Sequence, residues 1–242
     1  MVNMIKGVIG IIDILGVKGI WARESPEDII KKWNEILKSL NEDVEIMSKI
    51  IDKKDKIDRK IKEYSFSDTI ILTIASDSLN SLLVMCGIIG DIFSVSMDKG
   101  ILFRGAISFG NFYSHKTMLI GPAIDDAAEW YSKSDWAGVH LTPKTSYYID
   151  YCLAEGVKKD QIKYLLIKYN VPLKEGRILQ DIWTVSWPSI YLKCDEDGQK
   201  TSISDFRQKI LKIYSRNPIG IEHEKKYRNT IDYFDFVTSD MD

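Results

Sequence analysis

Two aspartates stand at the ends of apolar runs that predict β-strands, and they are the residues best placed to do chemistry. Asp13 follows the run GVIGII, and Asp68 opens the run TIILTI. A carboxylate beside a fully apolar strand loses hydration energy unless a cation or hydrogen bonds compensate it. If the two carboxylates met in space, they would repel each other unless a divalent ion lay between them. The pattern therefore indicates a candidate metal site.

The residues that follow Asp13 form a candidate anion site. Gly16-Val17 and then Gly19 come directly after the first strand. Glycines let the backbone turn its N–H groups toward a phosphate. From spacing alone a plainer interpretation stays open, in which Asp13 is a turn or helix-cap residue and Asp68 an ordinary strand-end residue.

Other catalytic patterns are missing from the sequence. The histidines lack HExxH spacing, the cysteines lack CxxC spacing, and neither GxGxxG nor GxxxxGK[ST] occurs. Zinc, dinucleotide and P-loop sites are therefore not expected. The residues concerned are His115, His140, His223, Cys86, Cys152 and Cys194.

Composition bounds the class of protein. The 242 residues suit one large domain or one domain with an appendage, and 45% of them are hydrophobic, enough for a sizeable core. A net charge of −2 gives no electrostatic reason to expect a nucleic acid or a membrane as partner. The apolar N-terminus, interrupted by Asp13, predicts a strand and not a signal peptide. With three scattered cysteines, this favours the cytoplasm.

Strand and helix patterns alternate along the chain, which predicts an α/β (α+β) fold with one main sheet. We expect a domain at 1–160 and a C-terminal extension, 161–242, packed on it. Strands are predicted at 5–14, 101–110, 117–121, 138–142, 162–170 and 180–192, and a turn that leads into a strand at 64–74, with Asp68 at the start of that strand. Helices are predicted at 25–52, 77–97, 122–134, from Pro143 onward, 202–215 and 221–236.

Four segments in this order resemble the class III nucleotidyl cyclase catalytic domain. They are IIDILG around Asp13, YSFSDTIIL around Asp68, RGAISFG (104–110) and IGPAIDDAAEWYSKS (120–134). More narrowly, they resemble the small pyrimidine nucleotide cyclases of bacterial Pycsar anti-phage systems, to which VSWPS (185–189) and EKKYRNTIDYF (224–234) are also similar. The resemblance is good over about 5–135 and loose beyond. It implies a central, mainly antiparallel sheet with helices on one face.

The resemblance also implies a two-metal site. Asp13 and Asp68 match the two aspartates that hold two divalent ions, Mn²⁺ or Mg²⁺, and the carbonyl of Ile14 matches a further ligand. These ions bind the triphosphate and help to deprotonate the ribose 3′-hydroxyl. Arg104 matches an arginine that contacts phosphate, and the Gly16-Val17 segment would also bind substrate.

Base and ribose contacts follow from the same resemblance. Tyr64 stands where purine cyclases have a base-reading lysine, which favours a pyrimidine. Asp125 matches a ribose-contacting asparagine. Glu129 stands where the family has its transition-state arginine, and a carboxylate about 4 Å from a phosphate costs roughly 4 kcal/mol at an effective dielectric near 20. Glu129 must therefore point away, pair with Lys133, or mark an inactive site.

The implied activity is cyclisation of a nucleoside triphosphate to a 3′,5′-cyclic nucleotide and diphosphate, with UTP expected narrowly ahead of CTP. A homodimer is implied, in which Asp13, Asp68 and Arg104 of one chain face Tyr64 and Asp125 of the other. The product would act on a separate effector protein. Two alternatives stay open: a purine cyclase, and a cyclase-like nucleotide-binding module without turnover.

Overall fold

The strand β1 (Ile5–Ile14) lies at the centre of the protein and is buried on both faces. Val8 and Ile12 pack into one core cluster, and Ile9 and Ile11 pack into another. Successive side chains of a strand point to opposite faces, so an unbroken apolar run needs cover on both. The structure, a computed structural model, describes residues 4–15, 24–55, 61–116, 118–193, 201–216, 221–239 and 241.

The sheet has eight strands and confirms the predicted mixed fold with a mainly antiparallel sheet. Its order is β2-β3-β1-β4-β6-β8-β7, and β5 pairs with β4 outside this path. Only the pairing of β4 with β6 is parallel among the described strands. The bounds are β2 (Ile61–Phe66), β3 (Thr69–Ile74), β4 (Phe103–His115), β5 (Met118–Ile120), β6 (Gly138–Leu141), β7 (Leu166–Pro172) and β8 (Ile178–Val185).

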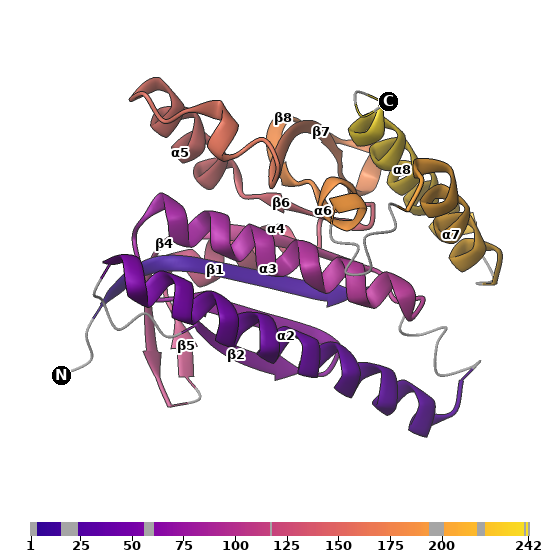
Figure 1. Ribbon diagram of the computed structural model, residues 1–242, viewed down its shortest axis with the longest axis horizontal. Coiled ribbons are helices and arrows are strands. Elements are labelled where there is room, and N and C mark those ends of the chain that lie inside the picture. Colours follow the sequence, from indigo (N-terminus) through magenta and orange to yellow (C-terminus); the bar gives the residue numbers. More distant parts are fainter. Residues whose placement is uncertain are drawn as a thin grey trace.

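Helices flank this sheet on both faces, whereas one covered face was expected (Figure 1). The helices α2 (Pro26–Asp55) and α3 (Leu79–Asp98) contribute to the larger core cluster. The short helix α4 (Pro122–Tyr131) covers the other face through Ala123 and Ala127. The expectation of one face is wrong because β1 is apolar on both sides.

The turn and strand predicted over 64–74 are present as the turn before β3 and β3 itself, and the strand β2 that precedes the turn was not predicted. Strands β2 and β3 are joined by the turn Ser67-Asp68, and Ser67 has the left-handed φ of 58° that such a turn needs. The charged stretch at 52–64, expected to be solvated, is divided between the end of α2, residues 56–60 outside the described part, and the start of β2.

The C-terminal part carries two strands and four helices. Helices α5 (Pro143–Ala154), α7 (Ile203–Arg216) and α8 (Ile221–Thr238) lie where helices were predicted. The strand predicted at 180–192 ends at Val185, and α6 (Trp187–Lys193) follows, with Pro188 in its first turn, where proline is tolerated.

The expected boundary near residue 160 stays a prediction. Beyond it, β8 joins the main sheet through the pair His140 and Thr184. Among the described residues, α3 is the one helix long and apolar enough to cross a membrane by composition, and 56% of that apolar window is buried, which is the position of a core helix.

His140 is fully buried in β6. Among the described residues neither of its ring nitrogens has a hydrogen-bond partner. Burial lowers the pKa of His140 from 6.5 to about 4, because the charged imidazolium cannot be solvated there.

We expect acid to destabilise the protein through this histidine. Between pH 6.5 and 4 the unfolded chain binds a proton that the folded chain does not, so the free energy of unfolding falls as the pH falls, by up to about 3 kcal/mol. His140→Leu should remove this part of the pH dependence in urea titrations at pH 7 and 4.5. The exposed His115 provides the control, His115→Leu. Equal acid sensitivity of all three proteins would contradict the prediction.

Candidate active site

The structure brings Asp13 and Asp68 together at one end of the sheet. Asp13 lies opposite Thr69 in the pairing of β1 with β3, and the N–H of Ile14 donates to the carbonyl of Asp68 at 3.1 Å. Burial and then the charge of Asp68 raise the pKa of Asp13, and the second effect indicates that the two carboxyl groups lie close together. The antiparallel register therefore creates a pair of carboxylates from residues remote in sequence.

Arg104 completes this group from the other side of β1. It lies directly opposite Asp13 in the pairing of β1 with β4. Its Nη2 and Nε donate to Oδ2 of Asp13 at 3.0 and 3.3 Å, and the two side chains are only 14% and 13% exposed. Gly105 permits this close approach, because a Cβ there would lie 2.3 Å from the carbonyl oxygen of Ile11.

The electrostatics of the pair leave Asp13 short of positive charge. Burial raises the pKa of Asp13 above its usual 3.8, Arg104 opposes the rise, and the carboxylate of Asp68 adds to it. Since the rise prevails, one arginine does not offset both desolvation and the neighbouring carboxylate. A further cation would stabilise this arrangement.

Two lysines that sequence reasoning missed lie beside this group. Lys174 is in the turn between β7 and β8, and Lys226 is on α8. Burial and then the charge of Arg104 lower the pKa of both lysines, while the charges of Asp135 and Asp13 act in the opposite direction. Within the described part of the chain neither lysine has an ion-pair partner.

Backbone contacts hold these lysines near the sheet end. The N–H of Asp135 donates to the carbonyl of Pro172 at 2.9 Å, and the N–H of Lys174 donates to the carbonyl of Lys133 at 2.9 Å. On α8, the side-chain amide of Asn229 donates to the carbonyl of Asp135 at 2.7 Å. The segment EKKYRNTIDYF contained Lys226, but only tertiary packing reveals which of its charges faces Arg104.

In the part of the chain that the structure describes, the remaining predicted site residues are not joined to the group formed by Asp13, Asp68 and Arg104. The hydroxyl of Tyr64 is 2.9 Å from Oγ of Ser114, and Asp125 is exposed in the first turn of α4. Among the described residues no hydrogen bond or ion pair joins either one to Asp13, Asp68 or Arg104. Gly16 and Val17 lie outside the described residues.

Glu129 takes one of the three courses expected for it. It forms an ion pair with Lys133, which lies just beyond the C-terminal end of α4, and both side chains are about half exposed. The Nζ of Lys133 also lies 5.5 Å from the centre of the Trp130 ring. The predicted pairing of Glu129 with Lys133 is confirmed.

Comparison with known proteins places this geometry in a structural context. No family model and no curated protein matches the sequence. The guanylate cyclase domain of RhGC from Catenaria anguillulae in complex with GTP matches in structure, with a TM-score of 0.53, 14% identity, and coverage of 76% of this chain and 98% of that one. The adenylyl cyclase CyaB from P. aeruginosa has a TM-score of 0.52, 14% identity, and coverage of 76% and 95%.

The fold is that of a class III cyclase catalytic domain. A bacterial light-regulated adenylyl cyclase agrees, with a TM-score of 0.51, 10% identity, and coverage of 87% of this chain and 99% of that one. At these identities the likeness establishes the cyclase fold, and the carboxylate pair lies at the end of its central strand.

The raised pKa of Asp13 provides a test of the geometry. Asp68→Asn removes a nearby negative charge, so the pKa of Asp13 should fall toward 3.8, as measured by NMR titration of its carboxyl carbon in metal-free protein. Because the pKa of Asp13 is higher in the folded than in the unfolded protein, its protonated form adds stability below pH 3.8, and this stability is lost as the pH rises through the folded-state pKa. In Asp68→Asn the two pKa values lie closer together, so the free energy of unfolding should fall less over this pH range. Asp125→Asn is the control, and an unchanged pKa in Asp68→Asn would contradict the arrangement.

Proposed function

We propose that this protein is a nucleotide cyclase, which converts a nucleoside triphosphate to a 3′,5′-cyclic nucleotide and diphosphate. The observation that carries the proposal is the meeting of Asp13, Asp68 and Arg104 at the end of β1 in a cyclase fold. Such a group of two carboxylates and an arginine suits a polyphosphate held with cations.

The donors present fit divalent ions such as Mg²⁺ or Mn²⁺. They are two carboxylates and the carbonyl of Ile14, all oxygen atoms. Burial first, and the neighbouring Asp68 to a lesser extent, raise the pKa of Asp13 against the opposing effect of Arg104, so a bound cation would stabilise the ionised carboxylate. Among the described residues no group of three or more acidic, histidine or cysteine side chains could hold a metal. That also fits, since Mg²⁺ is commonly held by one or two carboxylates together with substrate phosphates. When bound, the ions would polarise phosphate oxygens and lower the pKa of the attacking hydroxyl.

The chain's own residues would bind and orient the triphosphate. Arg104 uses Nε and Nη2 on Asp13, which keeps the carboxylate in place, and its other N–H donors can bind an anion. Lys174 and Lys226 add positive charge beside it and would hold the leaving diphosphate. In-line attack of the ribose 3′-oxygen on the α-phosphorus then forms the ring as the bond to the diphosphate breaks.

For the base we propose a pyrimidine, with UTP favoured over CTP. Tyr64 stands where the resemblance places a lysine in purine cyclases, and it occupies more depth than a lysine's narrow end. Its hydroxyl both donates and accepts, and Ser114 already positions it at 2.9 Å. A small base with polar edges matches this residue. We further propose that the product is a second messenger for a separate effector in anti-phage defence, made by a cytoplasmic homodimer.

One observation favours a second candidate, a nucleotide-binding module without turnover. Glu129 stands where the resemblance places the transition-state arginine, and it pairs with Lys133 just beyond the end of its helix. Neither residue then offers free positive charge to a phosphate. The two proposals differ in a single measurable property, namely turnover.

Activity should depend on the carboxylate pair. Purified protein with Mn²⁺ and each of the four ribonucleoside triphosphates should form a cyclic pyrimidine nucleotide, detected by mass spectrometry. Asp68→Asn should lower kcat by more than about 100-fold with the fold intact. A cyclic purine would overturn the pyrimidine assignment, and nucleotide binding without product would favour the module. Retained activity in Asp68→Asn would exclude the proposed metal site.

The lysine on α8 can be tested against its neighbour. Lys226→Met removes a half-buried charge near Arg104, whereas Lys225→Met removes an exposed charge one residue away. Loss of a charged hydrogen bond of about 1.5–3 kcal/mol predicts a decrease in kcat/KM of roughly 10- to 100-fold for Lys226→Met. Lys225→Met should behave like the unmodified protein. Equal kinetics for both variants would remove Lys226 from the site.

A further inference from the structure

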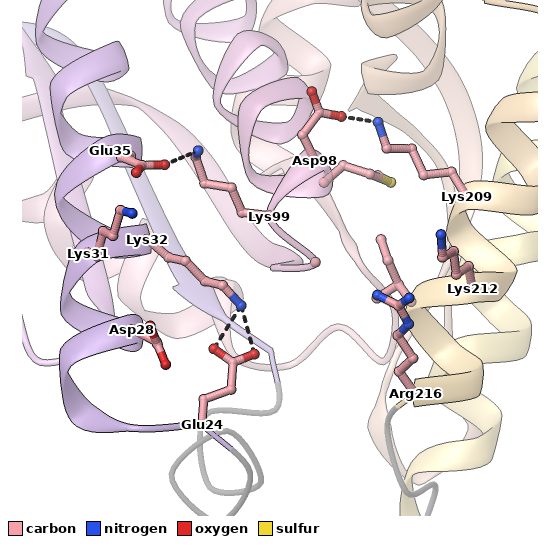
Figure 2. Close-up of a pocket in the computed structure, with 13 residues that line it drawn as sticks. Glu24, Asp28, Lys31, Lys32, Glu35, Asp98, Lys99, Lys209, Lys212 and Arg216 are labelled. Carbon is pink, nitrogen blue, oxygen red and sulfur yellow. Dashed lines mark hydrogen bonds and ion pairs between the residues drawn. The ribbon is translucent and has the colours of Figure 1, made fainter.

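A charged pocket of about 670 Å³ lies on the helical side of the protein. Figure 2 shows it between the first turns of α2, the end of α3, and α7, with side chains pointing inward from opposite walls. Met97, Gly100 and Ile213 provide its less polar surface. Its volume falls within the range of small-molecule sites, about 300–1,000 Å³.

Three of the four carboxylates in this pocket already pair with a lysine. Glu24 accepts from Lys32, Glu35 pairs with Lys99, and Asp98 pairs with Lys209, as the dashed lines in Figure 2 mark. The fourth carboxylate, Asp28, accepts the hydroxyl of Ser25. Among the described residues Asp28 is therefore the one carboxylate of the lining without a cationic partner.

Three cations remain without an ion pair among the described residues. They are Lys31 on α2, and Lys212 and Arg216 on α7. Lys212 and Arg216 are four residues apart on one helix, where like charges repel. They face the pocket from one wall, and Lys31 lies on the opposite wall (Figure 2). An anion bound between the walls would relieve this repulsion.

We propose that this pocket binds a small ligand that carries phosphate groups. Arginine and lysine together suit phosphate, since the guanidinium binds two oxygens in parallel and the ammonium adds a point charge. The lining carries six cationic and four acidic side chains, a net charge of +2, so a diphosphate matches it better than a single carboxylate does. Nothing in this argument depends on the proposed cyclase activity.

The pocket is distinct from the carboxylate pair but joined to it by a short segment. Gly100 lines the pocket, Leu102 accepts the N–H of Leu15 at 2.8 Å, and Arg104 binds Asp13. A ligand that holds Gly100 therefore contacts the segment that positions Arg104. Binding itself is the property to be tested.

The test uses inorganic pyrophosphate and the full chain in a buffer with EDTA, so that a divalent-dependent site does not contribute. Calorimetry should show one binding event, weakened at least about tenfold by Lys212→Gln with Arg216→Gln. Lys31→Gln, on the other wall, should also weaken it. The matched control, Lys158→Gln with Lys159→Gln, removes two exposed charges outside the pocket and should leave binding unchanged.

Three results would overturn the proposal. One is absence of binding to the unmodified protein. Another is equal weakening by both double variants, which would mean unspecific attraction to positive charge. The third is a result in which Lys226→Gln weakens pyrophosphate binding and the pocket variants do not, which would place the pyrophosphate at the carboxylate pair. Cyclase assays of the Lys212→Gln, Arg216→Gln variant separate the two proposals, because its turnover without added pyrophosphate should equal that of the unmodified protein.

Discussion

The contact between Asp13 and Arg104 is the constraint on which the candidate site depends. It is largely buried, so removing either partner would leave a poorly solvated charge. Its geometry follows from register, because β1 pairs with β3 and β4 so that Thr69, Asp13 and Arg104 form one row across the sheet. A slip by one residue would turn Asp13 to the opposite face. The apolar alternation of β1, packed against α3 on one face and α4 on the other, therefore fixes the position of a polar group at its end.

The charges around this contact sum to zero, which suits a ligand that is itself neutral once its counter-ions are counted. Asp13, Asp68 and Asp135 oppose Arg104, Lys174 and Lys226, so their formal charges cancel. A nucleoside triphosphate carries roughly four negative charges, which two divalent ions offset. Such a complex adds no net charge to the site. Its ions would lie nearest the carboxylates and its phosphates nearest the three basic side chains, which matches charge to charge at both ends.

The local sequence pattern predicted those helices and strands whose own residues show a clear apolar run or period. Strand β1 and helix α3 were predicted to within a few residues, because a continuous apolar run and a 3.6-residue period are strong signals. The pattern failed where a short apolar, aromatic run suits either state. The run after Val185 is a helix, since Trp187 stacks on Phe93 of α3 at 5.4 Å between ring centres, a tertiary contact that pattern alone does not contain. The same limit applies to Lys174 and Lys226, which come from the turn after β7 and from α8 and lie near Arg104 only after folding.

Glu129 shows that a residue's position in a sequence motif is weaker evidence for a role than the three-dimensional arrangement of charges. Lys133 is the one cation among the described residues of α4 and the turn after it, and Glu129 already pairs with it where the resemblance requires a free cation. Within the same chain, however, Lys226 is half-buried and acts electrostatically on the group that contains Asp13 and Arg104. Partial burial without an ion pair among the described residues makes this ammonium less favourable, and a bound polyphosphate would offset that cost. On this argument positive charge for the proposed reaction would come from Lys226 on α8 of the same chain, and the carboxylate of Glu129 on α4 does not by itself imply an inactive protein.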